Sequence, residues 1–312
     1  MTAELSVTDL TNLVSETRNP RTIDIDRLST RELVTRINSE DKLVALAVER
    51  ELPQVAKAVD LIEQAFRAGG RLIYIGAGTS GRLGVLDASE CPPTFSVPQS
   101  MVLGVIAGGE QALRNAVEGA EDSRDQGARD LEAANLARAD IVVGIAVSGR
   151  TPYVVGALEY AKQIGARTVS LSCNPHSELS KFADVDIAPV VGPEVLTGST
   201  RLKSGTAQKL VLNTLSTSAM IRIGKSYENL MVDLSISNHK LKTRAVAILC
   251  EITGLEPDDA ENLLAESGND VKRAILMNFT GLNRNDAQTC LDASGGILRK
   301  AIETSRRQSA QL

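Results

Sequence analysis

Tryptophan is absent from the sequence, and aromatic residues make up only 3% of its 312 residues. Few side chains are therefore available to stack on nucleic-acid bases. A net charge of -5 without a basic run argues further against a nucleic-acid partner. Long apolar runs are lacking too: none approaches the ~18 residues that a membrane span needs, and the first 20 residues hold no signal-like apolar stretch. We expect a cytoplasmic globular protein that binds neither nucleic acid nor membrane.

Cysteine and histidine are also scarce, at four and two residues. The cysteines lie far apart and form no CxxC pair: Cys91, Cys173, Cys250 and Cys290. Because so few histidines could complete a ligand set, the sequence predicts no metal site. We interpret the four cysteines as buried free thiols.

The sequence is rich, by contrast, in short β-branched runs that alternate with helical stretches between about residues 55 and 225. The runs are nearly all apolar, as in strands buried on both faces of a parallel sheet. We expect strands over 71–75, 100–106, 140–147, 167–172 and 185–190, and helices over 111–120, 152–164 and 203–223. This pattern predicts an α/β fold with a parallel five-stranded sheet flanked by helices, of the doubly wound, flavodoxin-like type, which binds ligands at the carboxyl ends of its strands.

Residues 1–54 before this domain (55–225) are more polar. We expect an extended arm over 19–26 and a helix over 29–50, with Ser29 or Thr30 near its N-cap and Glu32 in its first turn.

Residues 226–312 contain an internal repeat, in which 253–275 recurs as 280–302 with an offset of 27 residues. Each copy reads as a short helix, a Ser-Gly break and a second helix that begins near a basic pair. The repeat predicts a small all-helical C-terminal domain whose leucines and isoleucines form its core. A protein-interaction module is the alternative interpretation.

Two hydroxyl-rich turns follow strands of the predicted sheet. The first, 76–82 (GAGTSGR), matches the GxGxxG string of dinucleotide folds, but the next strand lacks the acidic residue that would hold a ribose. The second, 147–152 (VSGRTP), ends in a proline suited to the first turn of a helix. Either turn alone could be a simple helix cap, but together they predict a site for one phosphate monoester. The candidate ligands are Gly78, Thr79, Ser80, Ser148, Gly149 and Thr151.

Glu90 and Glu121 come just after the first two glycine turns, in 86–95 (LDASECPPTF) and 116–122 (AVEGAED). Two carboxylates beside a phosphosugar site could perform acid/base chemistry. From the residues alone, surface glutamates without a function are the favoured interpretation, and the motif context reverses this order. Glu118, one helical turn before Glu121, is a rival base or a ligand for sugar hydroxyls.

At these motifs the chain resembles sugar isomerase (SIS) domains, and more closely the N-acetylmuramic acid 6-phosphate etherases. The segments that carry the resemblance are 76–84, 86–94, 118–122, 193–203 and 238–241, and the similarity covers nearly the whole chain. It implies a homodimeric, cofactor-free carbon-oxygen lyase of cell-wall recycling. Such an enzyme removes D-lactate from C3 of a phosphorylated amino sugar by elimination and hydration.

The resemblance further implies Glu90 as the acid that protonates the departing lactate oxygen and Glu121 as the base that removes the C2 proton. The C2 proton is acidic only because the C1 aldehyde of the ring-opened sugar delocalises the negative charge. One carboxyl must therefore be protonated while the other is ionised. Burial, or the proximity of the two groups, would raise the pKa of the acid, and a nearby cation or N–H group would keep the base charged.

Several other residues are implicated by the same resemblance. Glu194 stands where related isomerases keep an acid/base glutamate, and its position is equally compatible with binding the sugar or capping a helix. Ser199 and Lys203 open the long helix that follows, where Lys203 could bring positive charge to the phosphate. A segment similar to the sugar-contacting part of glucokinase regulatory proteins implies substrate contacts by Asn238, Lys240 and Arg244, either within one chain or across a dimer interface.

Two other functions are compatible with a phosphosugar site. An aldose-ketose isomerase would shift a proton between C1 and C2 and release no lactate. A non-catalytic phosphosugar sensor would bind without turnover, but both glutamates are present and no second SIS unit is recognisable.

Overall fold

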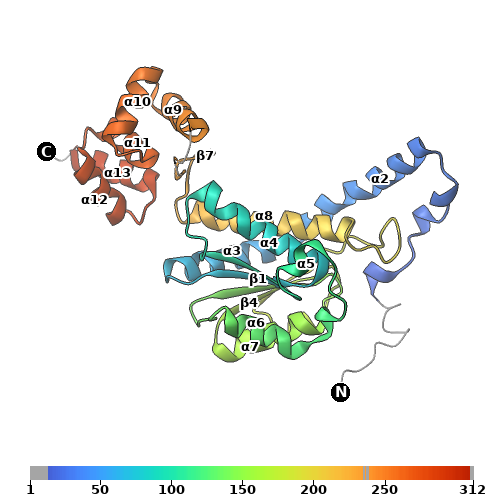
Figure 1. Ribbon diagram of the computed structural model, residues 1–312. Helices are drawn as coiled ribbons and strands as arrows, with labels where there is room; N and C mark the ends of the chain where they lie inside the picture. Colours follow the sequence, from blue (N-terminus) through green and yellow to red (C-terminus); the bar gives the residue numbers. More distant parts are fainter. Residues whose placement is uncertain (1–12, 235, 237–238, 310–312) are drawn as a thin grey trace. The chain divides into compact units, whose positions relative to one another are not determined.

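The computed structural model describes residues 13–234, 236 and 239–309 (Figure 1). The chain separates into two compact units. The first holds the described residues up to Ser89 together with Gln99–Ser216, and the second holds Glu90–Pro98 together with the residues from Thr217 onward. The three domain ranges expected from the sequence stay a prediction.

A five-stranded parallel sheet forms the centre of the first unit, in the order β2-β1-β3-β4-β5. Each strand overlaps the range predicted from its apolar run, which confirms the α/β fold. The strands are β1 (Leu72–Gly76), β2 (Val102–Ile106), β3 (Ile141–Ile145), β4 (Arg167–Leu171) and β5 (Val185–Ile187).

Helices cover both faces of the sheet, with α3, α4 and α8 opposite α6 and α7 (Figure 1). Successive side chains of β1 alternate between the faces, as a strand requires. Ile73 and Ile75 join the core formed with α7, whereas Tyr74 points the other way and its hydroxyl donates to Asp87 of α4 at 2.8 Å. The helices are α3 (Leu52–Arg67), α4 (Gly78–Phe95), α6 (Arg124–Ala133), α7 (Pro152–Ile164) and α8 (Lys203–Arg222).

The helix predicted over 111–120 is wrong. Only α5 (Gln111–Arg114) forms there, because Asn115 turns to an extended conformation and Gly119 adopts a left-handed one with φ of +72°. A single 3-10 turn, η4 (Ala120–Asp122), leads instead into α6.

The N-terminal segment confirms one expectation and corrects another. Ser29 caps α2 (Thr30–Glu49) in a capping box with Glu32, as predicted. The extended arm is wrong: the chain forms two 3-10 turns, η2 (Pro20–Thr22) and η3 (Ile25–Arg27). Asn19 promotes the first turn because its side chain accepts a hydrogen bond from the Arg21 N–H group.

The second unit contains a short hairpin, β6 (Ser226–Tyr227) and β7 (Leu230–Met231), followed by helices. Four of the helices form two pairs whose first residues recur 27 positions apart, so the repeat is confirmed. Equivalent apolar positions such as Leu264 and Leu291 are buried in one core. The helices are α9 (His239–Thr253), α10 (Pro257–Glu266), α11 (Val271–Thr280), α12 (Arg284–Ala293) and α13 (Leu298–Ser309).

All four cysteines are free thiols, but only two are buried as expected. Cys91 and Cys173 are buried, whereas Cys250 and Cys290 are half-buried. Burial raises the pKa of Cys173 to about 12, so this thiol is inert at neutral pH.

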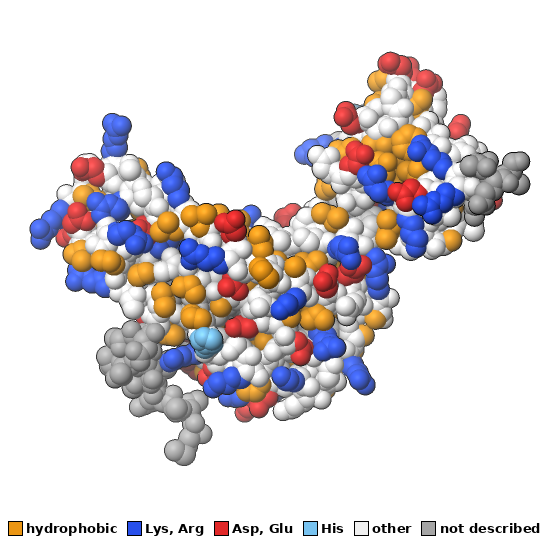
Figure 2. Space-filling view, turned by 180° about the vertical axis from the view of Figure 1, so that it is seen from behind, with side chains coloured by type: hydrophobic (Ala, Val, Ile, Leu, Met, Phe, Trp, Pro, Cys, Tyr) orange, Lys and Arg blue, Asp and Glu red, His pale blue; other side chains and the backbone are white. Residues whose placement is uncertain are grey.

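Charges of both signs are interspersed on the face of the molecule seen in Figure 2. No large single-sign field dominates that face. Among the helices in the described ranges, none is long and apolar enough to cross a membrane.

Candidate active site

The sheet order places β1 and β3 at the point where the chain reverses its direction of travel. β2 lies on one side of this pair and β4 on the other, and Gly76 at the end of β1 pairs with Ile145 at the end of β3. In open parallel sheets, the loops after two such strands enclose a ligand-binding crevice. Both hydroxyl-rich turns predicted from the sequence follow these strands, so the structure brings the turns together.

The first turn leads from β1 into α4. Gly78 enters the helix with φ of +54°, in the left-handed region that favours glycine. Thr79 is half-buried, and Ser80 is buried with its hydroxyl donating to Gln208 Oε1 at 2.9 Å. Because the first N–H groups of a helix have no partner within it, the start of α4 offers donors to an anion.

The second turn leads from β3 into α7. Gly149 has φ of +67°, and a Cβ atom built on it would lie 2.2 Å from Ser177 Cβ, so only glycine fits. Ser148 Oγ accepts from the Arg150 N–H group at 3.2 Å, which leaves its own hydrogen available for donation. Thr151 is the N-cap residue of α7, yet its side chain makes no capping hydrogen bond. The turn therefore presents hydroxyls at a second helix start.

Glu194 caps α8, which is one of the two roles that the sequence left open. Its carboxylate is fully buried and accepts from the Lys203 and Ser204 N–H groups at 2.9 Å and from Ser204 Oγ at 2.8 Å. Ser199 lies in the preceding turn, where its N–H group donates to the Leu196 carbonyl at 3.0 Å. The local structure at Glu194 is thus a helix start held by an internal carboxylate.

Lys203, which the sequence suggests could bring positive charge to the phosphate, is buried. Its side chain has an exposed fraction of 0%, and its ammonium group donates to Glu40 Oε2 at 2.9 Å and to the Val191 carbonyl at 3.0 Å. The charge of Lys203 is therefore paired inside the protein, and its contacts link α8 to α2 and to the loop at Val191.

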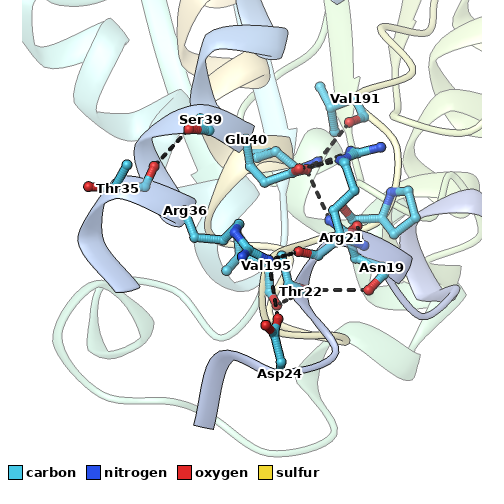
Figure 3. A network of polar contacts seen from close by, with 12 residues as sticks. Asn19, Arg21, Thr22, Asp24, Thr35, Arg36, Ser39, Glu40, Val191 and Val195 are labelled. Atoms are coloured by element: carbon cyan, nitrogen blue, oxygen red, sulfur yellow. Dashed lines mark hydrogen bonds and ion pairs between the residues drawn. The ribbon is translucent and has the colours of Figure 1, made fainter. Parts of the chain in front are cut away.

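Glu40 is the centre of the polar network shown in Figure 3. Besides Lys203, its carboxylate accepts from Asn19 Nδ2 at 2.9 Å and from the Arg21 guanidinium at 2.5 and 2.7 Å. These partners, led by Arg21, lower the pKa of Glu40 to about 2. Thr22 adds a bond from its hydroxyl to the Val195 carbonyl at 2.9 Å. The network joins the N-terminal segment and α2 to the loop that precedes α8.

Glu90 lies in α4 and Glu121 in η4, and both side chains are exposed. The two residues belong to different compact units. Glu118 is also exposed, and it does not share a helix with Glu121, because α5 ends at Arg114. The single chain therefore leaves the side chains of both candidates exposed.

Of the three residues expected from the segment before α9, Asn238 lies outside the described residues. Lys240 and Arg244 are exposed on α9, four residues apart and thus on neighbouring turns. Arg244 lines a cavity of about 540 Å³ in the second unit, together with Tyr227 and Phe279.

A polar contact between α4 and α8 was not predicted from the sequence. Asp87 of α4 accepts from Asn213 Nδ2 at 2.6 Å and from Ser216 Oγ at 3.1 Å, in addition to Tyr74. Burial raises the pKa of Asp87, against the three hydrogen bonds that lower it. Gln208 continues this contact toward Ser80.

In the part of the chain that the structure describes, no three histidine, cysteine, aspartate or glutamate side chains gather as they would around a metal ion.

The parallel sheet, with two hydroxyl-rich turns at its switch point, fits a SIS domain. Family models agree: that of the glucokinase regulatory protein N-terminal SIS domain matches residues 54–162, and that of the SIS domain matches residues 116–218. A putative phosphosugar isomerase from Bacteroides fragilis has a TM-score of 0.48 and 24% identity, covering 62% of this chain and 91% of its own.

Curated relatives narrow the class to one family. An N-acetylmuramic acid 6-phosphate etherase from Brucella anthropi is 63% identical over 274 residues, which cover 88% of this chain and 89% of the relative. N-acetylmuramic acid 6-phosphate etherase 2 from Vibrio cholerae is 61% identical with the same coverage. The chain belongs to the N-acetylmuramic acid 6-phosphate etherase family.

Proposed function

We propose that the chain is a carbon-oxygen lyase that cleaves the lactyl ether of N-acetylmuramic acid 6-phosphate. The products are N-acetylglucosamine 6-phosphate and D-lactate, which places the reaction in the recycling of cell-wall amino sugars. The observation that carries the proposal is the 63% identity to an etherase over 274 residues. The paired turns at the switch point of the sheet support it, since they suit a phosphorylated substrate.

The phosphate is proposed to bind where α4 and α7 begin. A phosphate dianion accepts hydrogen bonds and is favoured by the positive ends of helix dipoles. The turns offer backbone N–H groups at both helix starts, and Gly78 and Gly149 allow the backbone to approach the ligand. The hydroxyl donors are Thr79, Ser80, Ser148 and Thr151.

Glu121 and Glu90 are proposed to divide the proton transfers. Glu121 removes the C2 proton of the ring-opened sugar, and Glu90 protonates the C3 ether oxygen as the C–O bond breaks. The electron pair of the C2–H bond forms the C2–C3 double bond of an unsaturated aldehyde. Water then adds its oxygen to C3, and C2 regains a proton. Glu118 is proposed to bind a sugar hydroxyl, with the role of base as its alternative.

A second copy of the chain is proposed to complete the site in a homodimer. Gly78 and Glu90 are twelve residues apart in α4, which is about 18 Å of helix and longer than one phosphosugar. The distance along α4 does not restrict Glu90 of a second copy, which could approach the same sugar from another direction. Burial of the exposed Glu90 and Glu121 side chains on association would also supply the desolvation that holds one carboxyl in its protonated form.

The remaining proposed contacts divide into two groups. Asn238, Lys240 and Arg244 are proposed to reach the sugar bound by a second copy, and Ser199 to bind the sugar directly. Glu194 and Lys203 are proposed to act only by shaping the loop before α8, since both are fully buried.

Incubation of the purified chain with N-acetylmuramic acid 6-phosphate tests the reaction. We expect D-lactate and N-acetylglucosamine 6-phosphate in equal amounts, and no lactate from unphosphorylated N-acetylmuramic acid. Formation of a ketose without lactate would identify an isomerase, and binding without turnover would identify a sensor. Either result would overturn the proposal.

A further inference from the structure

Gln208 of α8 is buried beside the first phosphate turn. Its exposed fraction is 0%, and its Oε1 atom accepts from Ser80 Oγ at 2.9 Å. One turn earlier, Gly205 lies against Thr79: a Cβ atom built on it would be 3.6 Å from Thr79 Cγ2. The start of α8 therefore packs directly on the turn that is proposed to hold the phosphate.

The nitrogen end of the Gln208 carboxamide has no partner. Within the described residues, Gln208 Nε2 and Ser177 Oγ are the side-chain polar atoms that are buried without a hydrogen bond. Such an atom is unfavourable and uncommon. Asp87 lies two helical turns after Ser80 in α4, and its carboxylate accepts hydrogen bonds from three side chains. The contact at Asp87 therefore uses both carboxylate oxygens, whereas the contact between Gln208 and Ser80 leaves the Nε2 donor of Gln208 unused.

The Gln208 carboxamide can exchange the positions of its oxygen and nitrogen atoms within the same space. Its oxygen and nitrogen ends are nearly equal in size, so a half-turn about the last side-chain bond exchanges them without moving α8. In the observed orientation, Ser80 gives its hydrogen to Gln208. In the other orientation, Nε2 gives a hydrogen to Ser80 Oγ, and the serine hydrogen is released to point elsewhere. The unpaired atom is then a carbonyl oxygen, which proteins tolerate better than an unpaired N–H group.

We propose that Gln208 is a positioning residue that turns the Ser80 hydroxyl into a hydrogen-bond donor for the substrate phosphate. A phosphate dianion accepts hydrogen bonds only, so its binding selects the orientation in which Gln208 donates to Ser80. The same step gives Nε2 the partner that it lacks in the free chain. The inference rests on the proposed binding of a phosphosugar at the β1 turn.

Gln208→Met tests the idea because methionine is close to glutamine in size and offers no hydrogen bond. We expect thermal stability to change little, since the spare donor is removed while the buried Ser80 hydroxyl loses its acceptor. The affinities for inorganic phosphate and for N-acetylglucosamine 6-phosphate should fall about 10-fold, as for the loss of one hydrogen bond to a charged group. KM for the phosphosugar should rise by more than kcat falls.

Asn213→Leu is the matched control, because Asn213 bridges the same two helices but contacts Asp87. This variant should lose stability and keep its phosphate affinity. In a double-mutant cycle, Gln208→Met should add no further loss of phosphate affinity to Ser80→Ala, because Gln208 acts through Ser80.

Additive losses in this cycle would overturn the inference. So would a Gln208→Met variant that is destabilised but binds phosphate like the unmodified chain. The affinities are measured without turnover, so a chain that binds phosphate and releases no lactate would disprove the proposed function and leave this test valid.

Discussion

Lys203 Nζ lies 2.9 Å from Glu40 Oε2, and the exposed fractions of the two side chains are 0% and 3%. The contact joins positions 163 residues apart in the sequence. The two partners are not equivalent. The Glu40 carboxylate also binds Arg21 and Asn19, whereas the Lys203 ammonium group donates to the Val191 carbonyl besides Glu40.

Glu40→Gln should therefore destabilise the chain more than Lys203→Met does. The first variant leaves a buried ammonium group without its counter-ion, at a cost of about 3 kcal/mol, while the second leaves Glu40 with two partners. Urea unfolding measures both. Glu261→Gln is the control, because Glu261 and its partner Lys242 are both exposed, and it should change the free energy of unfolding least of the three. Equal losses for Glu40→Gln and Lys203→Met would contradict the asymmetry.

Glu40 should also make stability depend on pH. Its partners lower its pKa from 4.5 to about 2 in the folded chain, so folding favours the ionised form. The stabilisation is present above about pH 4.5, amounts to roughly 3 kcal/mol, and is lost as the pH falls toward 2. The difference in unfolding free energy between the unmodified chain and Glu40→Gln should shrink over this range. A difference that stays constant from pH 7 to pH 2 would show that the carboxylate charge is not what stabilises the fold.

The two glutamates proposed as acid and base should be separable by isotope exchange. Glu90→Ala and Glu121→Ala should each abolish lactate release while phosphosugar binding is largely kept. In deuterated water, the C2 proton should still exchange in Glu90→Ala, because the base is intact, and should not exchange in Glu121→Ala. Glu118→Ala is the matched control for an exposed glutamate nearby. Loss of exchange in Glu118→Ala, with exchange retained in Glu121→Ala, would transfer the role of base to Glu118.

Mixing the two inactive variants tests whether the site is shared between two copies. If Glu90 acts across the interface, half of the randomly assembled dimers are mixed, and each mixed dimer has one intact site. Activity should then recover to about a quarter of that of the unmodified enzyme. Recovery requires subunit exchange, which unfolding and joint refolding of the mixture provides. A mixture of refolded, demonstrably mixed dimers without activity would place both glutamates on the same chain.

Gly149→Ala should displace the second phosphate turn. The added Cβ atom would lie 2.2 Å from Ser177 Cβ, so the backbone must move, and KM for the phosphosugar should rise about 10-fold or more. Gly109→Ala has a similar φ of +65° but no atom within 4 Å, and serves as the control for strain alone. Ser177→Gly combined with Gly149→Ala should recover part of the loss. An unchanged KM in Gly149→Ala would remove the turn from the phosphate site.

Much of the fold could be predicted because its signals are local. The range of α7 was predicted to the residue, since Pro152 marks its start and Gly165 its end. α6 was missed because Leu131 and Gly127 are its only buried residues, so its sequence lacks a clear apolar period. The helix expected over 111–120 failed because Asn115 turns the chain, a conformation that its neighbours do not signal.

The site could be predicted only in part, because some of its contacts join residues that are far apart in the sequence. The turns at Ser80 and Gly149 follow strands directly and are visible in the sequence. Gln208 lies 128 residues from Ser80, and no local pattern links them. Lys203 looked like an exposed cation because its buried partner, Glu40, is far away in the sequence. The exposure of Glu90 was not predicted either, because no local pattern in 86–95 indicates whether its side chain is buried.

In the repeated helix pairs of the second unit, a side chain caps the start of a different helix in each copy. Asn283 caps α12 with its side chain, while Glu256, its equivalent 27 residues earlier, makes no such bond at α10. In the other helix of each pair the order is reversed: Asp270 caps α11, and Ile297 stands at the equivalent position before α13. A tandem duplication followed by divergence would leave this pattern. Each copy would then have kept one of the two capping side chains of the ancestral unit. A consensus of the two copies would restore both starts, and arrays built from it should be more stable than either natural copy.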